Sequence, residues 1–140
     1  MKISLVTVGK TNIAELRDSI ADYAKRINRY GSFEFVETSD DKLEKTLEKF
    51  ERVYLLDEKG REYTSVEMSQ FLEKQMMMSP KSVAFVVGGP FGFPQGVRDM
   101  SHGQIALSKM TFPHDLVRVI FLEQLYRAFT ILKNEKYHHE

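Results

Sequence analysis

The chain has 140 residues, 42% of them hydrophobic and 29% charged, with 20 basic and 20 acidic side chains. This profile is typical of a single globular domain over residues 1–140, and it excludes disordered and collagen-like classes. Because no run approaches the roughly 20 apolar residues that span a bilayer, and the N-terminus lacks the pattern of a leader peptide, we expect a cytoplasmic protein with no membrane partner.

The chain contains no cysteine, which excludes disulfides, thiolate zinc sites and cysteine nucleophiles. Its formal net charge is zero, so a nucleic-acid partner would have to be held by a local basic patch. His138 and His139 lack the spacing of a helical metal site, and no group of carboxylates accompanies them. We therefore expect no metal.

The first half of the chain alternates strand and helix patterns. Residues 3–8, "ISLVTV", form a β-branched run that predicts a strand, and apolar residues recur at helical spacing over residues 13–27. "FEFVE" at residues 33–37 predicts a second strand and is followed by a charged helix. "RVYLL" at residues 52–56 predicts a third strand, which we expect to be closed by a polar turn, "DEKGRE".

A helix is expected from Thr64 to Met78, because Thr64 and Glu67 have the spacing of a capping box. "SVAFVV", residues 82–87, is apolar on both faces, as is typical of a central parallel strand. This alternation predicts the α/β class, with a mostly parallel sheet flanked by helices. Ligands in such folds bind beyond the carboxyl ends of the strands.

A glycine-rich loop, "GGPFGFPQG", follows that central strand. It matches neither a dinucleotide fingerprint nor a P-loop, because Pro90 removes an N–H donor and no Lys-Ser or Lys-Thr follows Gly96. Two explanations stay open on these residues alone. The loop is a tight strand-to-helix turn that binds nothing, or its glycines let the backbone approach a ligand closely.

Residues 105–133 predict a short strand, a loop and a long helix. From Leu116 to Leu132 the helix is apolar on nearly every face, and such a helix must be covered all round. Either it is central within the domain or it faces a second subunit. We favour a symmetric homodimer, since a closed pair is the commonest oligomer.

Several motifs in this order closely resemble the RlmH family: "VVGGPFG", "LSKMTFPH", "VRVIFLEQLYRAF" and a terminal "YHHE". These SPOUT-type methyltransferases act on N3 of a pseudouridine in the helix 69 loop of 23S ribosomal RNA. The resemblance implies a SPOUT-type sheet flanked by helices with a C-terminal trefoil knot, an exception to the rule against knots. It also implies S-adenosyl-L-methionine as cofactor, ribosomal RNA as partner, and a homodimer whose active site is completed by the partner subunit. Because so small an enzyme has little surface for reading RNA unaided, we expect it to act on assembled ribosomes.

The resemblance assigns roles to individual residues. It implies catalytic or substrate-contacting roles for Arg127, Tyr137 and His138, and it makes His114 a secondary candidate. His138 would remove a proton or orient the base, Arg127 would stabilise the resulting anion, and Tyr137 would stack on or hydrogen-bond the base. The residues implied to bind the cofactor are Leu56, Gly89, Ser108, Lys109, Met110, Thr111, Phe112 and Pro113.

The residues alone also permit plainer explanations. Arg127 follows Glu123 by four positions, which is the spacing of an ordinary ion pair on a helix surface. Without the resemblance the C-terminal tail would be a frayed end. Two rival functions stay open: a SPOUT methyltransferase of another RNA, such as transfer RNA or a ribose 2'-OH, and a non-catalytic RNA-binding protein of ribosome assembly.

The sequence departs from the family pattern at two places that bear on function. Phe91 occupies a loop position that the family often fills with a smaller or polar residue. His139 and Glu140 end the chain where the family has a basic residue, which weakens the electrostatic part of RNA binding. The missing cysteine excludes the covalent route to methylated pyrimidine carbon and leaves nitrogen or ribose oxygen as the acceptor.

Overall fold

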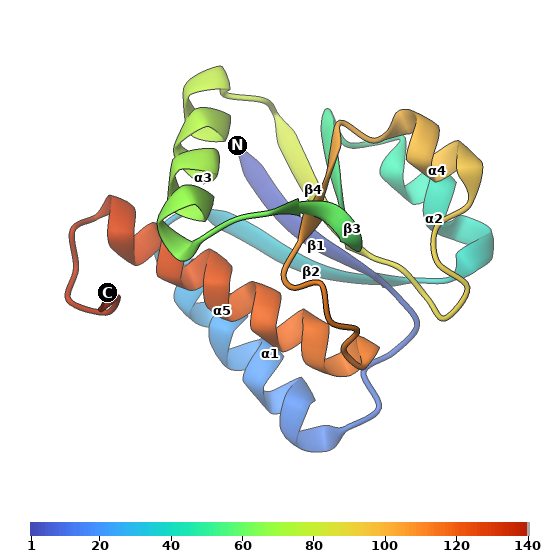
Figure 1. The fold of residues 1–140 in the computed structure, drawn as a ribbon, viewed down its shortest axis with the longest axis horizontal. Helices are drawn as coiled ribbons and strands as arrows, with labels where there is room; N and C mark the ends of the chain where they lie inside the picture. The colour runs from blue at the N-terminus through green and yellow to red at the C-terminus, as the bar shows by residue number, and fades with distance from the viewer. Residues whose placement is uncertain (140) are drawn as a thin grey trace.

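The computed structural model describes residues 1–139, in which strands and helices alternate and form three layers (Figure 1). The strands are β1 (Lys2–Val8), β2 (Ser32–Thr38), β3 (Arg52–Glu62), β4 (Ser82–Val87) and β5 (Gly103–Ala106). The helices are α1 (Ala14–Ile27), α2 (Asp40–Leu47), α3 (Ser65–Met78), α4 (Gln95–Met100) and α5 (His114–Leu132). The strands pair in parallel in the order β2-β1-β4-β3-β5, which confirms the predicted α/β class. The trefoil knot stays a prediction.

Two hydrophobic clusters separate the layers, because successive side chains of a strand point to opposite faces of the sheet. In β4, Val83, Phe85 and Val87 belong to the cluster shared with α1, α3 and α5. Ala84 and Val86 belong to the other cluster, which includes side chains of α2 and α4. Strand β4 is therefore buried on both faces, as the sequence predicted.

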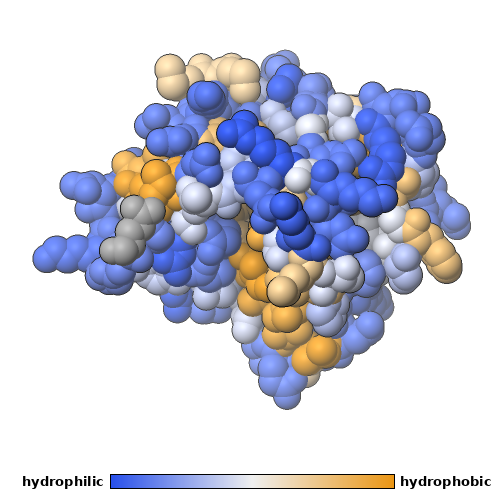
Figure 2. Space-filling model, in the orientation of Figure 1, coloured by the Kyte–Doolittle hydropathy of each residue, from blue (hydrophilic) through white to orange (hydrophobic). Residues whose placement is uncertain are grey.

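Helix α5 packs against both α1 and α3. This packing explains much of its all-round apolar character, although Val119 and Ile120 stay half-buried and Leu116 is exposed. Figure 2 shows apolar surface in the lower centre of the view, where Figure 1 places α5. The homodimer stays a prediction. The fully or nearly fully buried side chains of the helix are Arg118, Phe121, Leu122, Leu125, Ala128, Phe129 and Thr130.

The predicted turn after the third strand was wrong, because β3 continues through "DEKGRE" to Glu62. Leu56 and Arg61 both pair with Ile105, so residues 57–60 bulge out of the ladder. At Gly60 an added Cβ would lie 2.6 Å from the carbonyl carbon of Gln104. Glycine is thus what allows the strand to resume beside β5.

Helix α4 was not predicted from the sequence. It is only six residues long and begins directly after Pro94, inside the segment that we treated as a loop. Its buried residue Val97 belongs to the hydrophobic cluster that includes side chains of α2. Within residues 1–139 no helix is both long and apolar enough to cross a bilayer.

Candidate functional site

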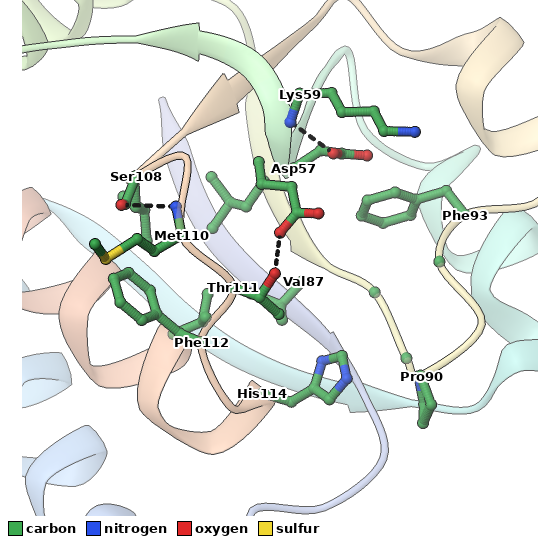
Figure 3. Close-up of a pocket in the computed structure, with 17 residues that line it drawn as sticks. Asp57, Lys59, Val87, Pro90, Phe93, Ser108, Met110, Thr111, Phe112 and His114 are labelled. Atoms are coloured by element: carbon green, nitrogen blue, oxygen red, sulfur yellow. Dashed lines mark hydrogen bonds between the residues drawn. The ribbon is translucent and has the colours of Figure 1, made fainter.

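A cavity of about 360 Å³ lies beside the bulge of β3 and the carboxyl end of β4 (Figure 3). Three segments line it: residues 56–59, residues 87–93 and residues 107–117. In Figure 3, Pro90 and Phe93 lie on one side of it and Phe112 on the other. The size lies within the range of about 300–1,000 Å³ that is usual for small-molecule sites, and the position is the one expected for this fold class.

The structure brings most of the predicted cofactor-binding residues to this cavity. Lys109 and Pro113 belong to the same segment but do not line it: the Lys109 ammonium lies 3.7 Å from Glu62, and Pro113 is the N-cap of α5. The secondary candidate His114 does line it. The predicted residues that line the cavity are Leu56, Gly89, Ser108, Met110, Thr111 and Phe112.

The glycine loop comes close to its neighbours at two points. A Cβ on Gly89 would lie 3.1 Å from Val8 Cγ1, and one on Gly88 would lie 3.0 Å from the ring of Phe93. Gly92 N–H donates to the Gly89 carbonyl over 3.1 Å, and Gly92 has φ +74°, a conformation that favours glycine. The loop is thus a tight turn in which a side chain at Gly88 or Gly89 would press on Phe93 or Val8.

Two acidic residues that the sequence analysis assigned to a turn line the cavity. The Thr111 hydroxyl donates to Glu58 Oε2 over 2.6 Å, so the β3 bulge is tied to the segment before α5 (Figure 3). Asp57 forms an ion pair with Arg98 at 3.2 Å. Because the Glu58 contact is with a neutral hydroxyl, its charge is less compensated than that of Asp57. This end of the cavity suits a cationic group.

Arg118 lies behind the cavity, and the sequence analysis did not identify it. Only 1% of it is exposed. Its guanidinium donates to Thr11 Oγ1 over 2.8 Å and to the Val8 carbonyl over 2.9 Å, while Glu37 lies 3.7 Å away. Burial lowers its pKa from the ordinary value. Arg118 therefore joins the end of β1 to the first turns of α5.

The predicted catalytic residues form a second cluster at the other end of α5. Arg127 Nη2 lies 2.7 Å from Glu123 Oε2, so the ion pair expected from their spacing is present. The Tyr137 hydroxyl donates to the same oxygen over 2.8 Å. Arg127 Nη1 lies 3.0 Å from His138 Nδ1, and its guanidinium carbon lies 4.8 Å from the Tyr137 ring centroid. The tail thus packs on α5.

The hydrogen bonds to Glu123 and the burial of the Tyr137 phenol favour the protonated forms of Arg127 and Tyr137. The Glu123 hydrogen bond raises the pKa of Arg127. Burial, followed by the hydrogen bond to Glu123, raises the pKa of Tyr137 above its ordinary value, so the phenol stays protonated. Because a guanidinium can donate hydrogen bonds but cannot accept them, Nδ1 of His138 accepts the hydrogen bond from Arg127. A neutral His138 therefore carries its proton on Nε2.

One chain does not bring the two clusters together. Val117 lines the cavity, and Arg127 follows it by ten residues on the same helix. At a rise of 1.5 Å per residue they are about 15 Å apart along the axis. A second cavity of about 290 Å³ lies between them, lined by residues that include Ile120 and Gln124, and it shares Leu107 with the first.

No metal site accompanies either cluster. Among residues 1–139, no three His, Asp or Glu side chains come together in an arrangement that could hold a metal ion. The hydrogen bonds and the ion pair described above account for the charged groups of the second cluster. The second cluster supplies one guanidinium, one phenol and one imidazole.

Comparison with protein-family models matches residues 1–138 to the family described as predicted SPOUT methyltransferase. A ribosomal RNA large subunit methyltransferase H of Cytophaga hutchinsonii is 46% identical, over 99% of this chain and 100% of its own length. A protein of the same name from Parabacteroides distasonis is 43% identical, over 100% of both chains.

Two solved structures share the fold. A probable methylase family protein of Haemophilus influenzae matches with a TM-score of 0.60 and 13% identity, over 99% of this chain and 70% of its own. A probable methyltransferase of Bordetella pertussis matches with a TM-score of 0.59 and 11% identity, over 91% and 95% respectively. At such low sequence identity, these structural matches show only that the fold is shared.

Proposed function

Because the chain belongs to the SPOUT methyltransferase family, we propose that it methylates ribosomal RNA with S-adenosyl-L-methionine. Its 46% and 43% identical relatives are named ribosomal RNA large subunit methyltransferase H, which confirms the resemblance to that family. The acceptor that we propose is N3 of a pseudouridine in the helix 69 loop of 23S ribosomal RNA, on the assembled ribosome in the cytoplasm. The observation that carries the proposal is the glycine-lined cavity beside the bulge of β3 and the carboxyl end of β4.

The volume of the cavity and the residues that line it support S-adenosyl-L-methionine as its ligand. Leu56 and Phe112 offer apolar surface to an adenine ring, and Gly88 and Gly89 let the backbone come close to it. Glu58 supplies a carboxylate for a cationic ligand. When bound, the cofactor supplies an electrophilic methyl group on its sulfonium. The protein's part in such an in-line transfer is mainly to position donor and acceptor.

Binding tests this assignment directly. Gly89→Val adds a side chain where a Cβ alone already meets Val8 at 3.1 Å, so we expect it to weaken cofactor affinity measured by calorimetry at least tenfold. Gly31→Val is the matched control, because nothing lies within 4 Å of a Cβ at Gly31. If circular dichroism shows that Gly89→Val is folded and its cofactor affinity equals that of the wild type, this cavity is not the cofactor site.

The second cluster provides groups for the acceptor base. Arg127 is held by Glu123 and is suited to stabilise negative charge as N3 loses its proton. Tyr137 stays protonated and is suited to stack on the base or donate to it. His138 accepts from Arg127 through Nδ1 and, when neutral, carries its proton on Nε2, so neither ring nitrogen is placed to take a proton from the base. This supports an orienting role for His138 better than the role of general base.

Two substitutions at His138 separate these roles. His138→Gln keeps an N–H donor but removes basicity, whereas His138→Ala removes both. If His138 orients the base, single-turnover methylation by His138→Gln stays within about tenfold of the wild type and His138→Ala is slower. If it is the general base, both variants lose about 100-fold or more. Full activity of His138→Ala would exclude both roles.

We further propose a homodimer in which the Arg127 cluster of the partner subunit faces the cavity. The separation of about 15 Å within one chain and the half-buried apolar residues Val119 and Ile120 support it. Complementation tests it: Gly89→Val lacks a working cavity and Arg127→Ala lacks a working cluster. Mixed dimers of the two contain one intact site, so mixing restores activity. No recovery in confirmed mixed dimers would place both halves of the site in one chain.

A further inference from the structure

Phe91 is exposed to an unusual degree for an aromatic residue. It is 93% exposed, more than Met77 at 79% or Met110 at 74%. In Figure 2 an apolar projection stands at the right-hand edge, where Figure 1 places the loop between β4 and α4. The neighbouring Phe93 is only 9% exposed and packs in the core. The Phe91 ring is therefore available to pack against a ligand that approaches this loop.

The loop holds this ring outward. Phe91 lies between Pro90, whose φ is fixed by its ring, and Gly92, whose φ is +74°. The hydrogen bond from Gly92 N–H to the Gly89 carbonyl closes the turn, and the buried Phe93 fixes its far end. A ring presented on such a turn loses little conformational freedom when something packs on it.

The cavity beside Phe91 is lined by apolar groups and by charged groups of both signs, including two carboxylates. Both of its neighbours, Pro90 and Gly92, line the cavity, so Phe91 lies at the rim. Lys59 lines the same cavity and is exposed. On the segment before α5, Met110 is largely exposed, and the Lys109 side chain is 84% exposed with only a 3.7 Å contact to Glu62. Exposed aromatic rings together with lysines are the groups that bind single-stranded nucleic acid.

We propose that Phe91 stacks on an unpaired nucleobase of the substrate RNA and so holds the target nucleotide at the mouth of the cavity. The inference rests on the proposed function, since it requires an RNA acceptor there. An unpaired nucleotide fits because its base offers a flat face to a single ring, while its phosphate would be attracted by Lys59 of the same cavity. A second copy of this chain is the competing occupant, but a lone ring bordered by glycines, proline and lysines offers it little apolar area.

The test compares Phe91→Ala and Phe91→Tyr with Met77→Ala, an exposed apolar residue at the far end of α3 and thus a matched control. Each variant, saturated with S-adenosylhomocysteine, is titrated against ribosomes and the isolated helix 69 stem-loop. We expect Phe91→Ala to raise the dissociation constant about tenfold, while Phe91→Tyr and Met77→Ala match the wild type. Cofactor affinity and the sedimentation coefficient stay unchanged.

Three outcomes would overturn the inference. RNA affinity of Phe91→Ala equal to the wild type removes the stacking role. A change in sedimentation instead of RNA affinity assigns Phe91 to a contact between copies of the chain. No RNA binding by the wild type removes the stacking role and the proposed function together. If the wild type binds RNA but transfers no methyl group, the proposed function fails alone, and the affinity of Phe91→Ala still decides the stacking role.

Discussion

Substitution of Gly60 by alanine tests the arrangement of β3 and β5 beside the cavity. A Cβ at Gly60 would lie 2.6 Å from the carbonyl carbon and 2.7 Å from the oxygen of Gln104. Ordinary carbon contacts are about 3.5–4.0 Å, so the β5 backbone must retreat by about 1 Å. Overpacking costs about 1–3 kcal/mol, and we expect the upper end because backbone cannot rotate away as a side chain can. For a chain of this size that is a fall in Tm of about 10 °C.

The matched control is Gly96→Ala. A Cβ there would also collide, but only with the carboxylate end of Glu44, an exposed side chain that can swing into solvent. Neither glycine has a positive φ, so backbone strain does not distinguish them. Gly96 lies within α4, where alanine gains about 0.5–1 kcal/mol in helix propensity.

Urea denaturation of both variants measures the difference. We expect Gly60→Ala to lose about 3 kcal/mol and Gly96→Ala to stay within about 0.5 kcal/mol of the wild type. We also expect Gly60→Ala to bind the cofactor more weakly than the wild type, because Glu58 and Lys59 directly precede residue 60 and line the cavity. If the two variants are equally stable, the close approach of Gly60 to β5 is not a constraint on the fold and the reasoning is refuted.

Three further substitutions test local features. Thr64→Ala removes the hydroxyl that accepts from the Glu67 N–H, although the backbone N–H of residue 64 can still donate to Glu67 Oε1, and it costs about 1 kcal/mol in urea denaturation; no loss would mean that the cap does not hold α3. Arg118→Lys loses the fork that serves two acceptors and costs about 2 kcal/mol; a fully stable variant would contradict its role as a link. Burial and then a hydrogen bond to Glu135 raise the pKa of Tyr30 to about 12 from an ordinary value of 10.0. Tyr30 therefore ionises at lower pH in the unfolded chain than in the folded one, and the free energy of unfolding falls as pH rises from about 10 towards about 12. Denaturation at about pH 9 and pH 12 measures this fall, which we expect to be smaller in Tyr30→Phe. An equal fall in Tyr30→Phe and the wild type would refute the assignment to Tyr30.

The sheet and most of its helices could be predicted from the sequence because the apolar pattern is local. The double-sided apolar run at residues 82–87 predicted a central strand, and β4 lies in the middle of the sheet. The Thr64 and Glu67 spacing predicted the start of α3, where the capping box is present. Short or irregular elements were missed: α4 has six residues, and the β3 bulge depends on its pairing with β5.

The candidate site was only partly predictable, for a physical reason. Motifs indicated Leu56, Gly89 and the segment before α5, but Asp57 and Glu58 line the cavity only because β3 bulges after Leu56. Arg118 looks like one cation in an apolar helix, and its buried contacts to β1 appear only when distant parts of the chain meet. The separation of about 15 Å between the cavity and Arg127 could be calculated only once the structure had placed Val117, on the same helix as Arg127, in the cavity lining.

The most direct test of the central claim is transfer of a labelled methyl group from S-adenosyl-L-methionine to ribosomes, separated subunits and free RNAs, followed by mass spectrometry of the labelled nucleotide. We predict label on N3 of a pseudouridine in the helix 69 loop of 23S ribosomal RNA, strongest on assembled ribosomes and absent with Arg127→Ala. Label confined to transfer RNA or to a ribose 2'-OH, or no label despite cofactor binding, would contradict the account.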